Sequence, residues 1–290
     1  MDNALRENRK KIGLIVDSTF GLNEELTKKE DVLVIPLTVY MDDVPHNDGT
    51  ITTEQLVEAF NSKVDFKTSQ PTPEAFLKAM DKHLESYEEV MVLCLTKALS
   101  GTYNSAMLAK DMCKKPDKVT VFDTESTSGG GLYFVEHSAR MRSEGKSVKE
   151  IVEHLEELKN LGTYYVTVDN LKYLVKGGRI SPAKAVIGNL LKKKPVLKFK
   201  DGLLGLDKSV RSFVGVKNYI YEKSSELSNE GELELTVYIS YVDDIERAQS
   251  VKSKLEELGP KINAKIVGQV SPVISAHVGL GALGIYIAKH

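Results

Sequence analysis

The chain has 290 residues, of which 41% are hydrophobic and 28% are charged, and its formal net charge is -2 at pH 7. This composition is typical of a folded globular protein, and the length exceeds what one hydrophobic core usually serves, so two α/β domains are expected. A slightly negative chain has no excess of cations to neutralise nucleic acid phosphates or an anionic membrane surface, so neither partner is expected.

The N-terminal segment 1–10 is charged and lacks the apolar run of a secretion signal. No stretch of the sequence has the length and hydrophobicity needed to span a bilayer. We therefore expect a cytoplasmic protein without stable membrane insertion. Cys94 and Cys113 are the two cysteines, and their spacing matches no metal or redox motif, so no metal site is expected.

The first half of the chain alternates short apolar runs with segments of helical periodicity. The runs at 12–16, 32–36, 90–95 and 119–122 are predicted to be buried strands. Strands that alternate with helices are typical of a parallel sheet covered by helices. Residues 1–162 are therefore predicted to form a layered α/β domain with a parallel sheet.

Two capping boxes mark helix starts in this half. Thr52 is followed by Gln55, and Ser147 is followed by Glu150, which is the spacing of a capping box. The helix that begins after Ser147 is predicted to end near Gly162, where the sequence pattern changes.

Residues 163–290 are predicted to form a second α/β domain with a mixed or antiparallel sheet. Asp201-Gly202 between two apolar runs is a strong hairpin signal. An amphipathic helix is predicted over 243–258. The strands predicted in this half are 164–168, 195–199, 203–210, 233–240, 264–267 and 273–276.

The first candidate functional cluster is Asp17 and Ser18, directly after the predicted strand 12–16. Ligands of α/β proteins bind at the carboxyl ends of parallel strands, so these side chains point toward a ligand crevice. The alternative is that both side chains satisfy backbone donors within the turn.

The second cluster contains Thr68 and Ser69 in a predicted extended loop, followed by Thr72 as N-cap and Pro73 as first residue of a helix. Pro71 restricts the chain, so the hydroxyls of Thr68 and Ser69 can be held in one geometry for a ligand. The alternative is that they are ordinary loop residues.

The third cluster, Ser100-Gly101-Thr102, follows a buried strand and opens a predicted helix. The N-terminus of a helix favours anions, Ser100 can donate its hydroxyl, and Gly101 lets a ligand approach the backbone N–H. The alternative is an ordinary N-cap serine.

Arg179 and His277 are the candidates in the second half. Arg179 lies between the glycine turn Gly177-Gly178 and Ser181-Pro182, which predicts a capped helix. Its guanidinium can pair with a carboxylate or a phosphate, or form a structural ion pair between the domains. His277 is predicted to stand at the end of strand 273–276, where a satisfied buried histidine is the alternative.

These clusters, in this order, resemble the DegV family, whose fatty-acid-binding members serve as the lipid-carrying subunit of a bacterial fatty acid kinase. The matching residues are spread from 15 to 284, over nearly the whole chain. They are Val16-Asp17-Ser18-Thr19, Thr68-Ser69-Gln70-Pro71, Ser100-Gly101-Thr102-Tyr103, Leu171, Tyr173-Leu174, Gly177-Gly178-Arg179-Ile180-Ser181, His277-Val278-Gly279 and Gly281-Ala282-Leu283-Gly284.

The resemblance implies a set of ligand-binding residues. Thr68, Ser100 and the backbone of Gly101 are implied to hydrogen-bond the carboxylate of one long-chain fatty acid, such as palmitate. Arg179 and His277 are implied to lie close to that carboxylate at the domain interface. The supporting residues are Asp17, Ser18, Ser69 and Thr102.

The resemblance also implies that the acyl chain occupies a buried tunnel in the second domain. A separate ATP-dependent kinase subunit would phosphorylate the presented carboxylate, so this chain would be a carrier with no catalytic residue and no cofactor. The sequence departs from the family pattern at Leu280, where proline is common, and at 122–126, which matches loosely.

Two other functions are compatible with the residue types. A serine-dependent acyl hydrolase or transferase would use Ser100 as nucleophile, His277 as base and Asp17 as orienting acid. However, no Gly-x-Ser-x-Gly elbow surrounds Ser100. A nucleotide-binding protein is the second alternative, because residues 279–284 match a dinucleotide fingerprint, but only six residues follow them, too few for the required helix and strand. No phosphate loop of the GxxxxGK type occurs either, so ATP binding is not expected.

Overall fold

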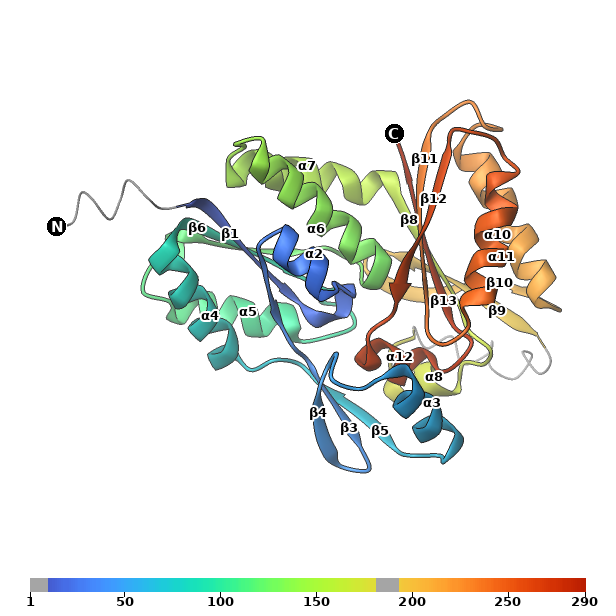
Figure 1. Cartoon of the computed structure of the whole chain (residues 1–290), viewed down its shortest axis with the longest axis horizontal. Coiled ribbons are helices and arrows are strands. Elements are labelled where there is room, and N and C mark those ends of the chain that lie inside the picture. The colour runs from blue at the N-terminus through green and yellow to red at the C-terminus, as the bar shows by residue number, and fades with distance from the viewer. Residues whose placement is uncertain (1–9, 181–192) are drawn as a thin grey trace.

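The structure is a computed structural model that describes residues 10–180 and 193–290 (Figure 1). The helix predicted from Ser181-Pro182 lies outside these residues. Each helix in these two ranges is too short or too polar to span a lipid bilayer.

The first sheet is parallel, as predicted, with the strand order β2-β1-β6-β7. Its strands are β1 (Lys10–Asp17), β2 (Val32–Ile35), β6 (Tyr87–Cys94) and β7 (Val119–Asp123). The elements that connect them include η1 (Ser18–Phe20), α2 (Glu24–Lys29), α4 (Pro73–Ser86), α5 (Thr102–Met112) and η2 (Pro116–Lys118). Helices α4 and α5 bury apolar side chains against one face of this sheet.

A small antiparallel sheet projects from the first one and was not predicted. It has the order β4-β3-β5 and is formed by β3 (Thr38–Met41), β4 (Val44–Asn47) and β5 (Phe66–Ser69), with α3 (Thr53–Asn61) between β4 and β5. Thr68 and Ser69, predicted to lie in an extended loop, are extended but belong to β5, where they pair with β3.

Helices α6 (Ser128–Ser143) and α7 (Val148–Leu161) follow the first sheet, and α6 lies between the two large sheets (Figure 1). Its glycine-rich first turn permits this close packing, because a Cβ on Gly131 would lie 2.0 Å from the Phe20 ring. Both predicted capping boxes are present, at Thr52 and at Ser147, and α7 ends before Gly162 as predicted.

The second sheet is mixed, as predicted, with the order β10-β9-β8-β13-β11-β12. Its strands are β8 (Gly162–Thr167), β9 (Lys194–Lys200), β10 (Leu203–Val210), β11 (Leu235–Tyr241), β12 (Ile262–Gln269) and β13 (Leu283–Lys289). Only β11 and β12 pair in parallel among these neighbours. The predicted hairpin joins β9 to β10 through Asp201 and Gly202, both with positive φ.

Helices pack on this sheet at two places. α10 (Phe213–Leu227) and α11 (Ile245–Glu256) cover its outer face, while α8 (Lys172–Gly177) and α12 (Pro272–Val278) pack together near α3 (Figure 1). The largest cluster of buried apolar side chains among the described residues lies between the two sheets and draws members from both halves of the chain.

One predicted strand is wrong. Residues 273–276 form the middle of α12, so His277 lies in the last turn of a helix and not at a strand end. The Ser271 side chain accepts a hydrogen bond from the N–H of Ile274, and Pro272 is the first helical residue, which explains why a short apolar run became a helix here. The strand β13, which follows the glycine-rich segment, was not predicted.

Candidate ligand-binding site

Asp17 fixes the carboxyl-terminal edge of the parallel sheet. Its fully buried carboxylate accepts hydrogen bonds from the backbone N–H of Leu95 at 2.6 Å and from the N–H and hydroxyl of Thr19 at 2.9 and 2.6 Å. Burial raises the pKa of Asp17 to about 6 in spite of these donors. Asp17 therefore holds the loops after β1 and β6 together.

Ser18 connects the same edge to α12. Its hydroxyl donates to Asp48 at 2.7 Å and accepts from the N–H of Leu37 at 3.0 Å. The other carboxylate oxygen of Asp48 accepts from the N–H of Val273 at 3.0 Å, in the first turn of α12. Asp48 is 6% exposed, and burial raises its pKa. Sequence reasoning missed Asp48, because the contacts that give it this role are all distant in the chain.

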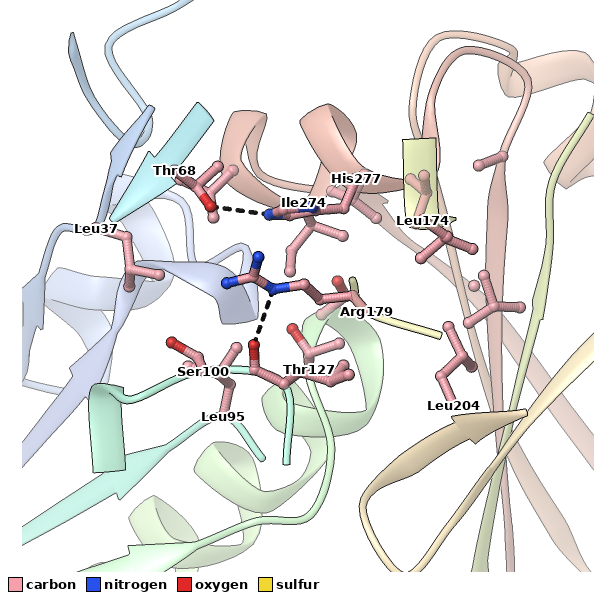
Figure 2. A pocket seen from close by; sticks show the side chains of 18 of the residues that line it. Leu37, Thr68, Leu95, Ser100, Thr127, Leu174, Arg179, Leu204, Ile274 and His277 are labelled. Carbon is pink, nitrogen blue, oxygen red and sulfur yellow. Dashed lines mark hydrogen bonds between the residues drawn. The ribbon is translucent and has the colours of Figure 1, made fainter. Parts of the chain in front are cut away.

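Thr68 and His277 meet across the two halves of the chain. Thr68 Oγ1 lies 2.8 Å from His277 Nε2, and a dashed line marks this bond in Figure 2. Burial, and secondly the charge of Arg179, lower the pKa of His277 to about 4. The imidazole is therefore neutral at pH 7, and it can accept from or donate to the Thr68 hydroxyl according to its tautomer.

Ser100 lies at the start of α5, next to the N-cap Gly101. Its hydroxyl is 2.9 Å from Thr102 Oγ1 and accepts from the N–H of Thr102 at 3.3 Å. Gly101 supplies no side-chain cap, and a Cβ at this position would lie 2.0 Å from Gln70 Oε1. The Gln70 amide, which donates to Ser105 Oγ at 2.8 Å, thus packs over Gly101.

Arg179 is held by two backbone carbonyl groups. Its Nε donates to the carbonyl of Leu99 at 3.2 Å, and its NH1 donates to the carbonyl of Gly177 at 2.5 Å. Figure 2 shows the guanidinium between Thr68 on one side and Ser100 on the other. A positive charge is thereby fixed where the two halves of the chain meet.

These groups border one end of a cavity of about 370 Å³. The predicted residues that line it are Thr68, Ser69, Ser100, Arg179 and His277. Asp17, Ser18, Gly101 and Thr102 do not line the cavity. Their contacts described above are with neighbouring residues of the site and its loops.

The rest of the cavity is mainly apolar and extends toward the second sheet. The apolar residues contributed by the second half include Val166, Leu174, Phe199, Leu204, Val242, Ile274 and Leu283. Leu174 and Leu204 lie on the side of the cavity away from Ser100 in Figure 2. Among the described lining residues Arg179 is the single cationic side chain and none is acidic. The cavity therefore suits an elongated apolar ligand with one anionic end.

Sequence reasoning missed four lining residues with polar side-chain groups, Gln70, Thr127, Ser128 and Tyr164. Gln70 was part of a matching motif but was given no role. Thr127 is the N-cap of α6 and Ser128 its first residue, directly before the glycine run 129–131, which is the one local feature that marks this helix start.

The residues of the hydrolase alternative do not form a hydrogen-bonded triad in the structure. His277 Nε2 is bonded to Thr68, the Ser100 hydroxyl to Thr102, and the Asp17 carboxylate to Thr19 and Leu95. Within 10–180 and 193–290, no group of three or more His, Cys, Asp or Glu side chains is placed to hold a metal ion.

Known proteins similar to this chain share its fold and nearly its full length. A family model described as an uncharacterised protein of the DegV family matches residues 11–290. A DegV domain-containing protein of Staphylococcus aureus is 32% identical over 277 residues, covering 95% of this chain and 98% of the relative.

Solved structures give the same result. A fatty-acid-binding DegV family protein from Thermus thermophilus has a TM-score of 0.91 and 29% identity, covering 97% of this chain and 100% of that one. A stearic-acid-binding protein from Eubacterium ventriosum has a TM-score of 0.84 and 28% identity, covering 96% and 98%. From these matches in sequence and structure, the chain belongs to the DegV family.

Proposed function

We propose that this protein binds one long-chain fatty acid in the cavity between its two sheets. The observation that carries the proposal is the polarity of the cavity, which has hydroxyls and one fixed cation at one end and mainly apolar side chains over the remainder. The relatives from Thermus thermophilus and Eubacterium ventriosum are described as binding a fatty acid and stearic acid, which supports the same ligand class here.

The carboxylate is proposed to lie at the polar end. There the hydroxyls of Thr68 and Ser100 donate to it, and Arg179 supplies the complementary charge because His277 is neutral. The backbone N–H of Gly101 is proposed as a further donor at the start of α5. Asp17, Ser18, Ser69 and Thr102 are proposed to hold these groups in place.

The acyl chain is proposed to run from there into the apolar part, against the second sheet. Burying it gains roughly 0.8 kcal/mol per methylene, or about 11 kcal/mol for roughly fourteen methylenes. The loss of translational and chain freedom cancels much of this gain. We expect the remainder to keep the lipid bound during purification.

We further propose that the protein is a non-catalytic carrier in the cytoplasm that presents the carboxylate to an ATP-dependent fatty acid kinase subunit. A non-catalytic role is supported by the hydrogen bonds of the site, because the Ser100 hydroxyl bonds to Thr102 and His277 bonds to Thr68, so Ser100 is not paired with a base. We also propose that residues 1–162 form a domain with the carboxylate-binding loops, and that residues 163–290 form a domain that houses the acyl chain.

The test uses palmitate-loaded protein with ATP, magnesium and hydroxylamine, which traps an acyl phosphate as its hydroxamate. The protein alone is expected to give no hydroxamate, and addition of a bacterial fatty acid kinase subunit is expected to produce it. Hydroxamate formation by the protein alone would contradict the carrier role, and it would leave lipid binding itself intact.

A further inference from the structure

Two buried hydroxyls line the cavity at the start of α6. Thr127 is 5% exposed and Ser128 is 2% exposed, and both line the cavity. Thr127 Oγ1 makes no hydrogen bond with a described group, whereas the Ser128 hydroxyl interacts with the hydroxyl of Tyr164, which also lines the cavity. A hydroxyl removed from water without a replacement partner costs free energy, so a polar partner from a ligand or from water is expected here.

These hydroxyls lie at the N-terminus of α6, a helix of 16 residues. The first N–H groups of a helix have no partner inside it, and the N-cap Thr127 gives α6 no side-chain cap. Ser128 adopts a φ of 47°, in the left-handed region that favours glycine. The start of α6 thus places the hydroxyls of Thr127 and Ser128 side by side in the chain and in the lining of the cavity.

This cluster carries no charge of its own. Figure 2 shows Thr127 between Ser100 on one side and Leu204 on the other, at the transition from the polar end to the apolar part. The carboxylate of a bound fatty acid is attracted to Arg179, the single cation among the described lining residues. The α6 cluster is therefore available to a second, uncharged polar group of the ligand.

The position of Thr127 and Ser128 in the cavity determines which part of the ligand can carry the uncharged polar group. The carbonyl of Ser126 accepts from the N–H of Thr96 at 2.9 Å, and Thr96 in turn bonds through its carbonyl to the N–H of Leu99. The start of α6 is thus tied to the segment that carries Ser100. A ligand substituent that reaches Thr127 must be near the carboxylate and not at the far end of the acyl chain.

We propose that Thr127, Ser128 and the first N–H groups of α6 form a subsite for a hydroxyl group near the carboxyl end of the acyl chain, so that the protein prefers 3-hydroxy fatty acids over unsubstituted ones. This inference rests on the proposed fatty acid binding. A ligand hydroxyl both donates and accepts, and it would satisfy groups that a plain hydrocarbon chain leaves without a partner.

The test measures dissociation constants of the delipidated full-length protein for palmitate, 3-hydroxypalmitate and 16-hydroxypalmitate. We expect 3-hydroxypalmitate to bind roughly 3- to 10-fold more tightly than palmitate, the gain of about one net hydrogen bond. We expect 16-hydroxypalmitate to bind more weakly than palmitate, because its hydroxyl would enter the apolar part of the cavity.

The variants Thr127→Val and Ser128→Gly should reduce the preference, and together they should abolish it. Valine has the shape of threonine, and glycine adopts the positive φ of Ser128 without strain, so both variants should fold. Ser126→Ala is the matched control, since Ser126 Oγ is also buried without a partner but does not line this cavity. It should keep the wild-type preference.

Equal or weaker binding of 3-hydroxypalmitate by the wild-type protein would overturn the inference, since water would then satisfy the cluster. An equal loss of palmitate and 3-hydroxypalmitate binding in the double variant would also overturn it, because the cluster would then bind the carboxylate. A wild-type protein that binds none of the three acids would instead refute the proposed function itself.

Discussion

At the scale of single residues, the positive charge and the neutral hydrogen-bond donors at the polar end of the cavity belong to different side chains. Arg179 carries the positive charge, held by the carbonyls of Leu99 and Gly177, while Thr68 and Ser100 offer neutral donors. His277 is neutral and positions Thr68 through the 2.8 Å bond. A carboxylate in this site is thus oriented by hydroxyls and attracted by one guanidinium.

The double variant Thr68→Val with Ser100→Ala tests these donors. Each lost hydrogen bond to a charged group is worth about 1.5–3 kcal/mol, so palmitate affinity is expected to fall by at least roughly 100-fold. Titration of the delipidated protein with palmitate measures the loss. Ser143→Ala, at the far end of α6, serves as the control, and unchanged palmitate affinity in the double variant would contradict the carboxylate assignment.

The buried His277 makes the stability of the lipid-free protein depend on pH. Its pKa is about 4 in the folded protein, and the ordinary value is 6.5, so the unfolded state binds more protons between these values. Stability is therefore lost as the pH falls from about 6.5 toward 4, by at most roughly 3 kcal/mol.

Urea unfolding of the wild-type protein and of His277→Gln at several pH values isolates this contribution. The raised pKa of Asp17 acts in the opposite direction, but it is common to both proteins and cancels in the difference. The wild type should lose more stability than the variant between pH 6.5 and 4. Parallel pH profiles would show that His277 is not buried in its neutral form.

At the scale of elements, the start of α6 is the point where the two sheets approach each other. Gly131 faces Phe20 of η1, and a Cβ on Gly130 would come within 3.0 Å of Tyr286 in β13. Gly131→Ala would place its Cβ 2.0 Å from the Phe20 ring, and such overpacking costs about 1–3 kcal/mol.

Chemical denaturation of Gly131→Ala should show this loss in the free energy of unfolding. Gly205→Ala in β10 is the matched control, because a Cβ there meets nothing within 4 Å. Equal stability of the two variants would mean that α6 is not wedged against η1 as described.

The elements with strong local signals were predictable from the sequence. The four parallel strands, both capping boxes and the hairpin at Asp201-Gly202 each carry their signal within a few residues, and the structure has them all. The strand prediction for residues 273–276 was wrong because an apolar run of four residues fits a strand or a buried helix equally well. Ser271 and Pro272 were the helix-start signals that decided between them.

The sequence predicted the separate clusters of the candidate site, but it did not predict the contacts that bring these clusters together. The sequence placed Asp17 and Ser100 at strand ends, and the structure brings both to the same edge of the first sheet. Asp48 and the bond between Thr68 and His277 depend on contacts more than 200 residues apart, for which the sequence has no local signal. Thr127 was missed because its hydroxyl does not follow the usual capping pattern.

At the scale of the whole molecule, the central core joins the two halves. Its buried side chains come from both sheets and from α6 and α7, and the cavity is lined from both halves. Because neither half has this core without the other, the lipid-free protein should unfold by heat in one cooperative transition. Calorimetry that resolves two transitions would contradict this shared core and would favour independent domains of residues 1–162 and 163–290.

Mass spectrometry of the purified protein, first under native and then under denaturing conditions, tests the central claim most directly. The account predicts one fatty acid per chain, retained in the native spectrum and released on denaturation. A chain that carries no lipid and also fails to take up added palmitate or oleate would contradict it.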